Sequence, residues 1–135
     1  MTQISSTDVK KGEFIMNNLY IPSSSSSDIV VLSGCYESRD FEIVTFRGHP
    51  NAYVSFPEGR YMEDENDVED EAHELVHGGF TYLGHRSSGR LMLGWSYNHY
   101  GDFNANSPNL GGEKWTLPSI LAEVISAIDG LNSIY

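Results

Sequence analysis

The side chains that could do chemistry gather in two short stretches, VHGGFTYLGH at residues 76–85 and GWSYNHYGD at residues 94–102. The first stretch holds imidazoles, a hydroxyl and two adjacent glycines. The second holds aromatic rings, a further imidazole and a carboxylate. The candidate ligand-binding residues are His77, Gly78, Gly79, Thr81, Trp95, Tyr97, His99 and Asp102. Aromatic walls with a few polar groups are typical of small-ligand sites, so these stretches predict a binding pocket.

Several chemistries are open to this set. Aromatic rings could stack on a nucleobase or another planar ring. The two imidazoles of His77 and His99 could act as acid and base near neutral pH, or bind a metal with Asp102. Asp102 could instead orient an imidazole or accept a ligand hydroxyl. Histidines and tryptophans also occur on sheets as plain core or surface residues, so the pattern alone assigns no catalytic residue.

Two neighbouring strands are expected to position these side chains, at residues 75–85 and 91–100. A loop at residues 85–90, with serines and a glycine, joins them as a hairpin. Side chains alternate between the two faces of a strand. The glycines are unusual in a strand interior and indicate that another group comes close.

The hairpin register decides which candidate side chains meet. One register sets His77 opposite His99, Gly79 opposite Tyr97 and Thr81 opposite Trp95. It would bring two imidazoles, a hydroxyl, an indole and a phenol to one surface, with a hollow at Gly79. A slip of one residue would turn the face over.

Further strands are predicted upstream, because short β-branched and alternating apolar runs occupy residues 28–36, 41–48 and 52–56. A turn signal, GHPN, lies at residues 48–51. The histidine in this signal and the one in the acidic stretch below, His49 and His73, are expected to be ordinary turn and surface residues.

An amphipathic helix is predicted at the end of the chain. Thr116 can cap it, and Pro118 falls in the first turn, where a missing N–H costs nothing. Its apolar face is formed by Ile120, Leu121, Val124, Ile125, Ile128 and Leu131, and Gly130 is expected to weaken its end. Strands first and a helix last predict an α+β domain, an antiparallel β-sheet with the C-terminal amphipathic helix packed on one face.

Residues 62–75, MEDENDVEDEAHEL, are mostly carboxylates. Like charges disfavour an isolated helix here, so an exposed loop with one helical turn near Glu71 is expected. A solvated loop, a divalent-cation site and a docking surface for a basic partner are the open readings, although the spacing does not match an EF-hand. The candidate partner-binding residues are Glu63, Asp64, Glu65, Asp67, Glu69, Asp70 and Glu71.

The composition narrows the class of protein. The net charge is -11 over 135 residues, which disfavours direct binding of nucleic acid. Cys35 is the one cysteine, so no intrachain disulfide can form and a reducing cytoplasm is expected. No run of about 20 apolar residues predicts a membrane span. We expect no metal and no other cofactor.

The N-terminal region differs from the rest in composition. Residues 1–27 are polar and end in a run of serines, which predicts a flexible leader before a single α+β domain at residues 28–135. KKGE at residues 10–13 can be encoded by a purine-rich ribosome-binding sequence, and we therefore hypothesise that Met16 is the natural start.

Three segments, AYVSFPEG, VHGGFTYLG and LGWSYNHYGD, occur in this order over about half of the chain. In this they resemble a functionally uncharacterised family of small proteins of bacteriophages and prophages, with HGG-L-T and W-x-x-G-F-D-x-x-H-x-G-D segments. The matching positions are Tyr53, Pro57, Gly59, His77, Gly78, Gly79, Thr81, Gly94, His99, Gly101 and Asp102. The family's GFD is GWS here, at residues 94–96, so an aspartate is missing, which favours binding over catalysis.

The resemblance implies a phage accessory protein in the host bacterial cytoplasm. Such proteins often block host defence, so we expect a non-enzymatic anti-defence protein. It would bind a nucleotide-like signal in the pocket, or a host defence protein through the acidic stretch. The alternative is a small His- or metal-dependent hydrolase acting on a nucleotide-like substrate. A structural or regulatory phage protein also remains open, and a homodimer is the assembly we favour.

Overall fold

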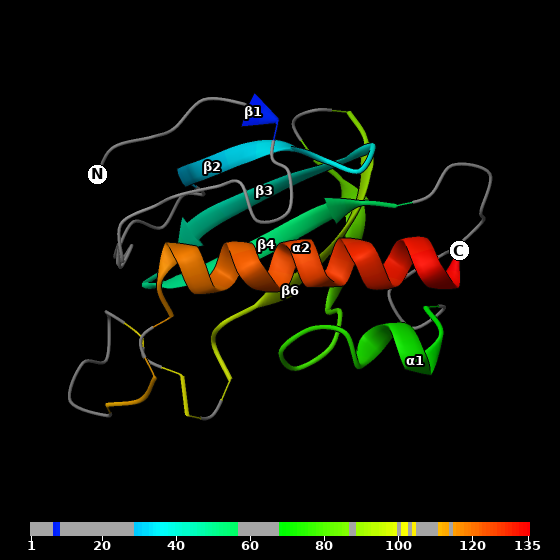
Figure 1. The fold of residues 1–135 in the computed structure, drawn as a ribbon. Helices are drawn as coiled ribbons and strands as arrows, with labels where there is room; N and C mark the ends of the chain where they lie inside the picture. Colours follow the sequence, from blue (N-terminus) through cyan, green and yellow to red (C-terminus); the bar gives the residue numbers. More distant parts are fainter. Residues whose placement is uncertain are drawn as a thin grey trace.

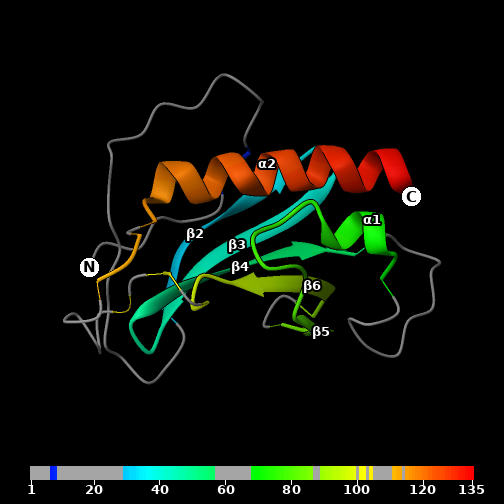
Figure 2. The ribbon, with the colours of Figure 1, turned by 90° about the horizontal axis from the view of Figure 1, so that it is seen from below.

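The computed structural model describes residues 7–8, 29–56, 68–86, 89–99, 101–102, 104, 111–113 and 115–135. In this part of the chain, six strands form one sheet in the order β1-β2-β3-β4-β6-β5, and a long helix lies across one face (Figures 1 and 2). The elements are β1 (Thr7–Asp8), β2 (Ile29–Tyr36), β3 (Arg39–Phe46), β4 (His49–Ser55), α1 (Asp70–His73), β5 (Tyr82–His85), β6 (Leu91–Ser96) and α2 (Leu117–Ile134). β1 is parallel to β2 and the other described pairings are antiparallel. The predicted α+β fold is confirmed.

Strands β2, β3 and β4 form a meander with two-residue turns. Glu37 and Ser38 have φ of 48° and 67°, and Arg47 and Gly48 have φ of 51° and 88°. Positive φ at both central positions suits the right-handed twist of a hairpin. Because Arg47 and Gly48 complete the second turn, residues 49–51 already belong to β4. The predicted turn at residues 48–51 was therefore placed too late.

The side chains of the meander alternate as their sequence pattern predicts. Phe41, Ile43 and Val54 lie in the main core, on the face that α2 covers. Val44 and Tyr53 belong to a smaller cluster of buried residues. This alternation is the one expected for a strand whose two faces are both partly covered.

Helix α2 begins and packs as predicted. The hydroxyl of Thr116 accepts a hydrogen bond from the backbone N–H of Ser119, and the two residues form a capping box. The buried side chains of α2 are Leu117, Ile120, Leu121, Val124, Ile125, Ala127, Ile128 and Leu131. By length and composition α2 could also span a membrane, a property that core helices share.

Gly130 lies within α2, which continues to Ile134. A Cβ at Gly130 would lie 2.9 Å from Cδ1 of Leu75 and closer to its Cδ2. The glycine therefore lets the segment after α1 pass close under the helix. We had expected it to mark a weak helix end, and its packing role is the physical reason for the difference.

The first of the two predicted central strands is largely absent. Residues 74–81 form turns and loop, and only Tyr82–His85 is a strand. Gly78 and Gly79 have φ of 73° and 80°, a conformation outside the strand region. β6 likewise ends at Ser96, before the predicted end at residue 100. The paired glycines are a turn signal in this context and not a feature of a strand.

The sequence left the hairpin register open, and the structure decides it where the strands pair. Tyr82 lies opposite Gly94 and Leu83 opposite Leu93, which is the register that would set Thr81 opposite Trp95. The backbone N–H of Thr81 also donates to Gly94 O at 2.8 Å. His77 lies beyond this ladder, so its position depends on the turn before β5.

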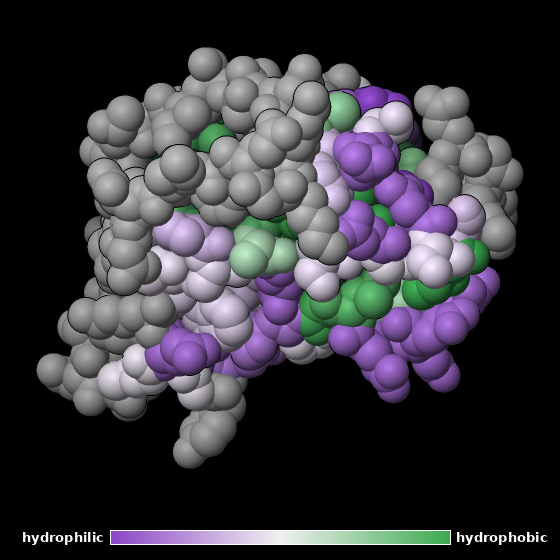
Figure 3. Space-filling model, in the orientation of Figure 1, coloured by the Kyte–Doolittle hydropathy of each residue, from purple (hydrophilic) through white to green (hydrophobic). Residues whose placement is uncertain are grey.

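The acidic stretch contains the expected single helical turn, α1. Ala72 and Val76 are buried, which holds the turn against the core beside α2 (Figure 2). Glu69, Asp70 and Glu71 are exposed, and the surface over α1 is hydrophilic in Figure 3. The other candidate partner-binding residues, Glu63, Asp64, Glu65 and Asp67, lie outside the described residues. Pro57, Gly59, Met16 and nearly all of residues 1–27 also lie outside them.

Candidate functional site

A histidine–aspartate pair forms the centre of the site. Nε2 of His77 lies 2.8 Å from Oδ2 and 3.0 Å from Oδ1 of Asp102. The Asp102 side chain is 4% exposed and the His77 side chain is 28% exposed. Since a carboxylate oxygen accepts, Nε2 carries the hydrogen, and Nδ1 of the neutral ring is an acceptor. The predicted role of Asp102 in orienting an imidazole agrees with this geometry.

Asp102 accepts hydrogen bonds from two further groups. The backbone N–H of His99 donates at 2.9 Å and Nε1 of Trp115 donates at 2.8 Å. Burial alone would raise the pKa of the Asp102 carboxyl. The bonds from His99, His77 and Trp115, with the charge of His77, outweigh burial and hold that pKa below its usual value. The carboxyl is therefore ionised at neutral pH.

Local turns bring these groups to Asp102. The backbone N–H of Asp102 donates to His99 O at 2.9 Å, which closes the turn after β6. Glu113 N donates to Gly101 O at 2.8 Å, so the chain returns beside Asp102 just before α2. Trp115, which precedes the helix cap, thereby reaches the carboxylate.

Aromatic rings fix the plane of the His77 imidazole. Its ring stacks on that of Tyr97, with centroids 5.5 Å apart and an angle of 8°. The centroid of Trp115 lies 4.9 Å away, and His99 meets the ring edge-on at 5.2 Å. The imidazole is thus held by one hydrogen-bond acceptor and three rings, while part of it stays in contact with solvent.

The two glycines before β5 make room for histidines. A Cβ on Gly78 would lie 2.7 Å from Cδ2 and Cε1 of His99 and closer to Nε2. A Cβ on Gly79 would lie 3.3 Å from Nδ1 of His73. The hollow predicted at Gly79 is therefore occupied by the His73 side chain. Nδ1 of His73 accepts from Phe80 N at 3.1 Å, so His73 supports this turn and is not the ordinary surface residue that we expected.

The environment of His99 differs from that of His77. Its Nε2 is buried and has no hydrogen-bond partner in the part of the chain that the structure describes. His49 also departs from the prediction, because it is buried in β4 with Nδ1 3.2 Å from Pro50 O. Of the two imidazoles of the predicted pair, His77 is the one whose ring is oriented by a carboxylate.

Glu123 on α2 is a member of the site that the sequence analysis missed. Its Oε1 accepts from the Tyr97 hydroxyl at 2.5 Å, from Trp95 Nε1 at 3.0 Å and from the His77 backbone N–H at 3.3 Å. Burial, then the charge of Glu123 and the hydrogen bond to it, raise the pKa of Tyr97 far above its usual value. A glutamate three residues after Ile120, on the buried side of the helix, was the signal that could have identified it.

Four of the eight predicted binding residues meet in one group. We call His77, Tyr97, His99, Asp102, Trp115 and Glu123 the His77 cluster. Trp95 and Tyr97 are 1% and 0% exposed, so they support the cluster from within the core and leave no open aromatic wall. Thr81 is exposed and, in the described contacts, joins the sheet through its backbone N–H.

No three His, Cys, Asp or Glu side chains among the described residues come close enough to hold a metal ion. Of the two histidines predicted as possible metal ligands with Asp102, His77 directs Nε2 at Asp102 and His99 directs Nε2 at Gly78. The arrangement can hydrogen-bond a ligand at His77 or exchange a proton there. No protein-family model, curated protein or solved structure matches this chain.

Proposed function

We propose that this protein is a phage accessory protein of the host bacterial cytoplasm that binds and neutralises a component of host defence without chemical turnover. Its ligand is a nucleotide-like signal, held at the His77 cluster. The observation that carries the proposal is the partly exposed imidazole of His77, oriented by the buried carboxylate of Asp102. The phage context rests on the sequence resemblance.

A fixed imidazole is suited to recognition. The pairing with Asp102 leaves Nδ1 of neutral His77 as an acceptor, and Nδ1 makes no hydrogen bond with a described residue. A ligand that presents an O–H or N–H group, such as a sugar hydroxyl or a base N–H, fits this atom. Because the ring is already ordered by Tyr97 and Trp115, binding costs little side-chain entropy.

A defence protein bound through the acidic stretch is the second form of this proposal. Glu69, Asp70 and Glu71 are consecutive and exposed, and they suit a basic surface. Binding of that kind weakens steeply with added salt. Replacement of Asp70 and Glu71 by Asn and Gln would abolish it and would leave nucleotide binding at His77 intact.

A His-dependent hydrolase is the alternative from another class. The pairing of His77 with Asp102 is the arrangement in which a carboxylate orients a general base, and this observation favours it. Nδ1 of His77 would take a proton from a water molecule that attacks a phosphoester. A hydrolase would convert the nucleotide-like molecule to a product, whereas a binding protein would release it unchanged.

The test begins with native mass spectrometry of the protein purified from bacterial cells, followed by denaturation and identification of any released molecule. Calorimetric titration with a panel of linear and cyclic nucleotides then compares the wild type with His77→Ala and His85→Ala. His85 is exposed on β5 and is the matched control. Nucleotide binding that is lost only in His77→Ala supports the proposal. A protein that is empty and binds none of the panel, or loss of binding in both variants, refutes binding at the cluster.

A further inference from the structure

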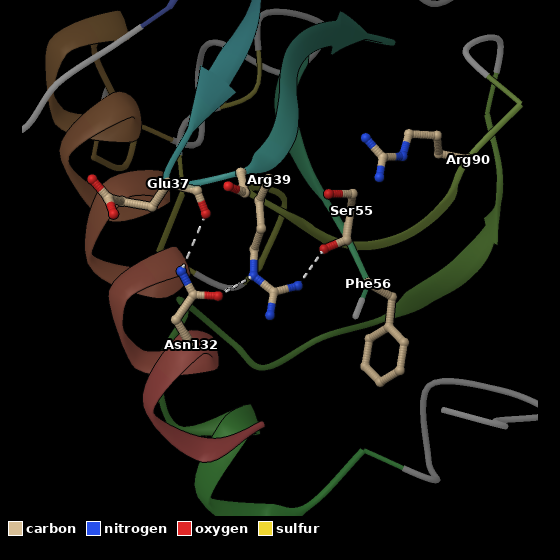
Figure 4. Close-up of a pocket in the computed structure, with 7 residues that line it drawn as sticks. Glu37, Arg39, Ser55, Phe56, Arg90 and Asn132 are labelled. Atoms are coloured by element: carbon tan, nitrogen blue, oxygen red, sulfur yellow. Dashed lines mark hydrogen bonds between the residues drawn. The ribbon is translucent and has the colours of Figure 1, made fainter. Parts of the chain in front are cut away.

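A concave surface lies near the C-terminal end of α2, where the β2–β3 turn meets β4. This hollow has a volume of about 350 Å³. It is lined by Arg39, Ser55, Phe56, Arg90 and Asn132, with the turn residues Glu37 and Ser38 at its edge (Figure 4). Nine residues of α2 separate Asn132 from Glu123, which corresponds to about 14 Å along the helix. The hollow is therefore distinct from the His77 cluster.

Arg39 is a buried cation that has no carboxylate partner among the residues that the structure describes. It is 8% exposed. Its Nε donates to Asn132 Oδ1 at 2.6 Å and its Nη1 donates to Ser55 O at 2.8 Å. Both acceptors are neutral, and no ion pair joins Arg39 to a described residue. Figure 4 shows the guanidinium between Asn132 and Ser55, with its remaining terminal nitrogen directed away from both.

This environment is unfavourable for a lone charge. Buried charges are normally paired, because neutral acceptors compensate only in part for the water that the charge loses. Burial accordingly lowers the pKa of Arg39 from its ordinary value, although a guanidinium stays protonated at neutral pH. In a chain of net charge -11, a buried arginine that lacks a carboxylate partner within the described part is an unusual feature.

The other charged groups around the hollow do not neutralise Arg39. Arg90 Nη1 bonds to Asp40 Oδ2 at 2.7 Å, and both side chains of this pair are more than one-third exposed. Figure 4 shows the Glu37 carboxylate directed away from the Arg39 guanidinium, and Arg90 on the far side of Ser55. Both guanidinium groups line the hollow, and of the two, only that of Arg90 has a carboxylate partner among the described residues.

We propose that this hollow is a second ligand site, which binds a small molecule through a carboxylate or phosphate oxyanion held by Arg39 and Arg90. Guanidinium groups form charge-assisted, often bidentate hydrogen bonds with such oxyanions. The Phe56 ring lines the same hollow and packs edge-on against Tyr135 with centroids 5.5 Å apart; it is 5% exposed, so it forms part of the wall beside the body of the ligand.

The proposal is tested by NMR titration of the full chain at constant ionic strength. The probes are phenyl phosphate, benzoate, inorganic phosphate and the neutral analogue benzyl alcohol. We expect phenyl phosphate or benzoate to shift the signals of Arg39 Nε–H and of the Phe56 ring, and benzyl alcohol to leave them in place. Phenyl phosphate and benzoate distinguish a phosphate ligand from a carboxylate ligand. Comparison with inorganic phosphate shows whether the phenyl ring of the probe contributes to binding.

Three arginine variants make the test specific. Arg90→Gln removes an exposed charge and is expected to weaken binding roughly tenfold, as loss of a charge-assisted contact does. Arg39→Lys keeps the buried charge but loses the planar fork, and it is expected to weaken binding more. Arg47→Gln removes an exposed arginine at the β3–β4 turn and is expected to leave binding unchanged.

Several outcomes would overturn the proposal. These are no shift with any anionic probe, equal weakening by Arg47→Gln and Arg90→Gln, or equal binding of benzyl alcohol. Shifts confined to the His77 cluster and lost in His77→Ala would also overturn it. The result is independent of nucleotide binding at His77, so either site can fail without the other.

Discussion

Gly78 lies directly against the imidazole of His99, with no space for a side chain between them. A Cβ at this position would come within 2.7 Å of two ring carbons. The backbone of Gly78 also has φ of 73°, which L side chains rarely adopt. The first residue of the glycine pair therefore sets both the course of the chain before β5 and the place of a histidine after β6.

Gly78→Ala is expected to destabilise the protein by about 2–4 kcal/mol, because backbone strain and overlap with His99 add together. Chemical denaturation monitored by tryptophan fluorescence would measure the loss. Gly89→Ala is the control, since Gly89 has a similar φ of 82° and open space at its Cβ. It is expected to lose only about 1 kcal/mol. Equal losses in the two variants would show that the His99 contact contributes nothing.

Local patterns predicted much of the fold. The alternation around Phe41 and Val54, the cap at Thr116 and the apolar face of α2 each act over a few residues, and all of them hold in the structure. The sequence left the hairpin register open, because a slip of one residue turns the face over, and the pairing of Tyr82 with Gly94 decides it. Gly78 and Gly79 were misjudged because positive φ values, which single residue types do not reveal, turn the chain there.

The site was predictable only in part. His99 and Asp102 are placed together by the short-range geometry of the turn after β6, whereas His77 was found from its residue type and is positioned by the turn before β5. Glu123 was missed because it reaches the cluster through packing of α2 on the sheet, and Trp115 because the chain returns to Asp102 at Glu113, before α2 begins. The charged hollow at Arg39 depends likewise on Asn132 of α2, and no local motif marks it.

Asp102→Asn is expected to cost about 2 kcal/mol at neutral pH, because an amide cannot accept from His77, His99 and Trp115 with the same geometry. In the wild type the folded-state pKa of Asp102 is lowered. The carboxyl therefore stabilises the fold at pH values above its unfolded-state pKa of about 3.9. This contribution is lost as the pH falls through that value towards the folded-state pKa. Urea denaturation between neutral pH and pH 3 would measure it.

The wild type should therefore lose more stability in acid than Asp102→Asn does. Asp70→Asn, which changes an exposed carboxylate on α1, is the control and should follow the wild type. Equal acid sensitivity of the wild type and Asp102→Asn would contradict the role of Asp102 as an ionised acceptor.

Glu123→Ala is expected to destabilise the fold by about 2–3 kcal/mol, since it leaves the donors of Tyr97, Trp95 and His77 without their acceptor. Ser126→Ala, an exposed change on the same helix, should stay within about 0.5 kcal/mol of the wild type. Thermal denaturation by circular dichroism compares the two. In Glu123→Ala the imidazole of His77 should also become less ordered, which its NMR line widths would report.

Tyr97→Phe is expected to change the response to alkaline pH. Burial, with Glu123, raises the folded-state pKa of the phenol above its ordinary value of 10.0. The neutral phenol therefore contributes stability that is fully present below pH 10 and is lost as the pH rises further, because only the unfolded chain ionises there. Tyr97→Phe removes this pH-dependent contribution, so the stability of the variant should fall less between pH 9 and pH 11, although it starts lower by about 1 kcal/mol for the lost hydrogen bond.

Tyr82→Phe, on the edge strand β5, is the control, and the stability of this variant should fall as steeply as that of the wild type. Parallel curves for Tyr97→Phe and the wild type would mean that the phenol ionises within the folded protein, and the hydrogen bond to Glu123 would then not keep it neutral.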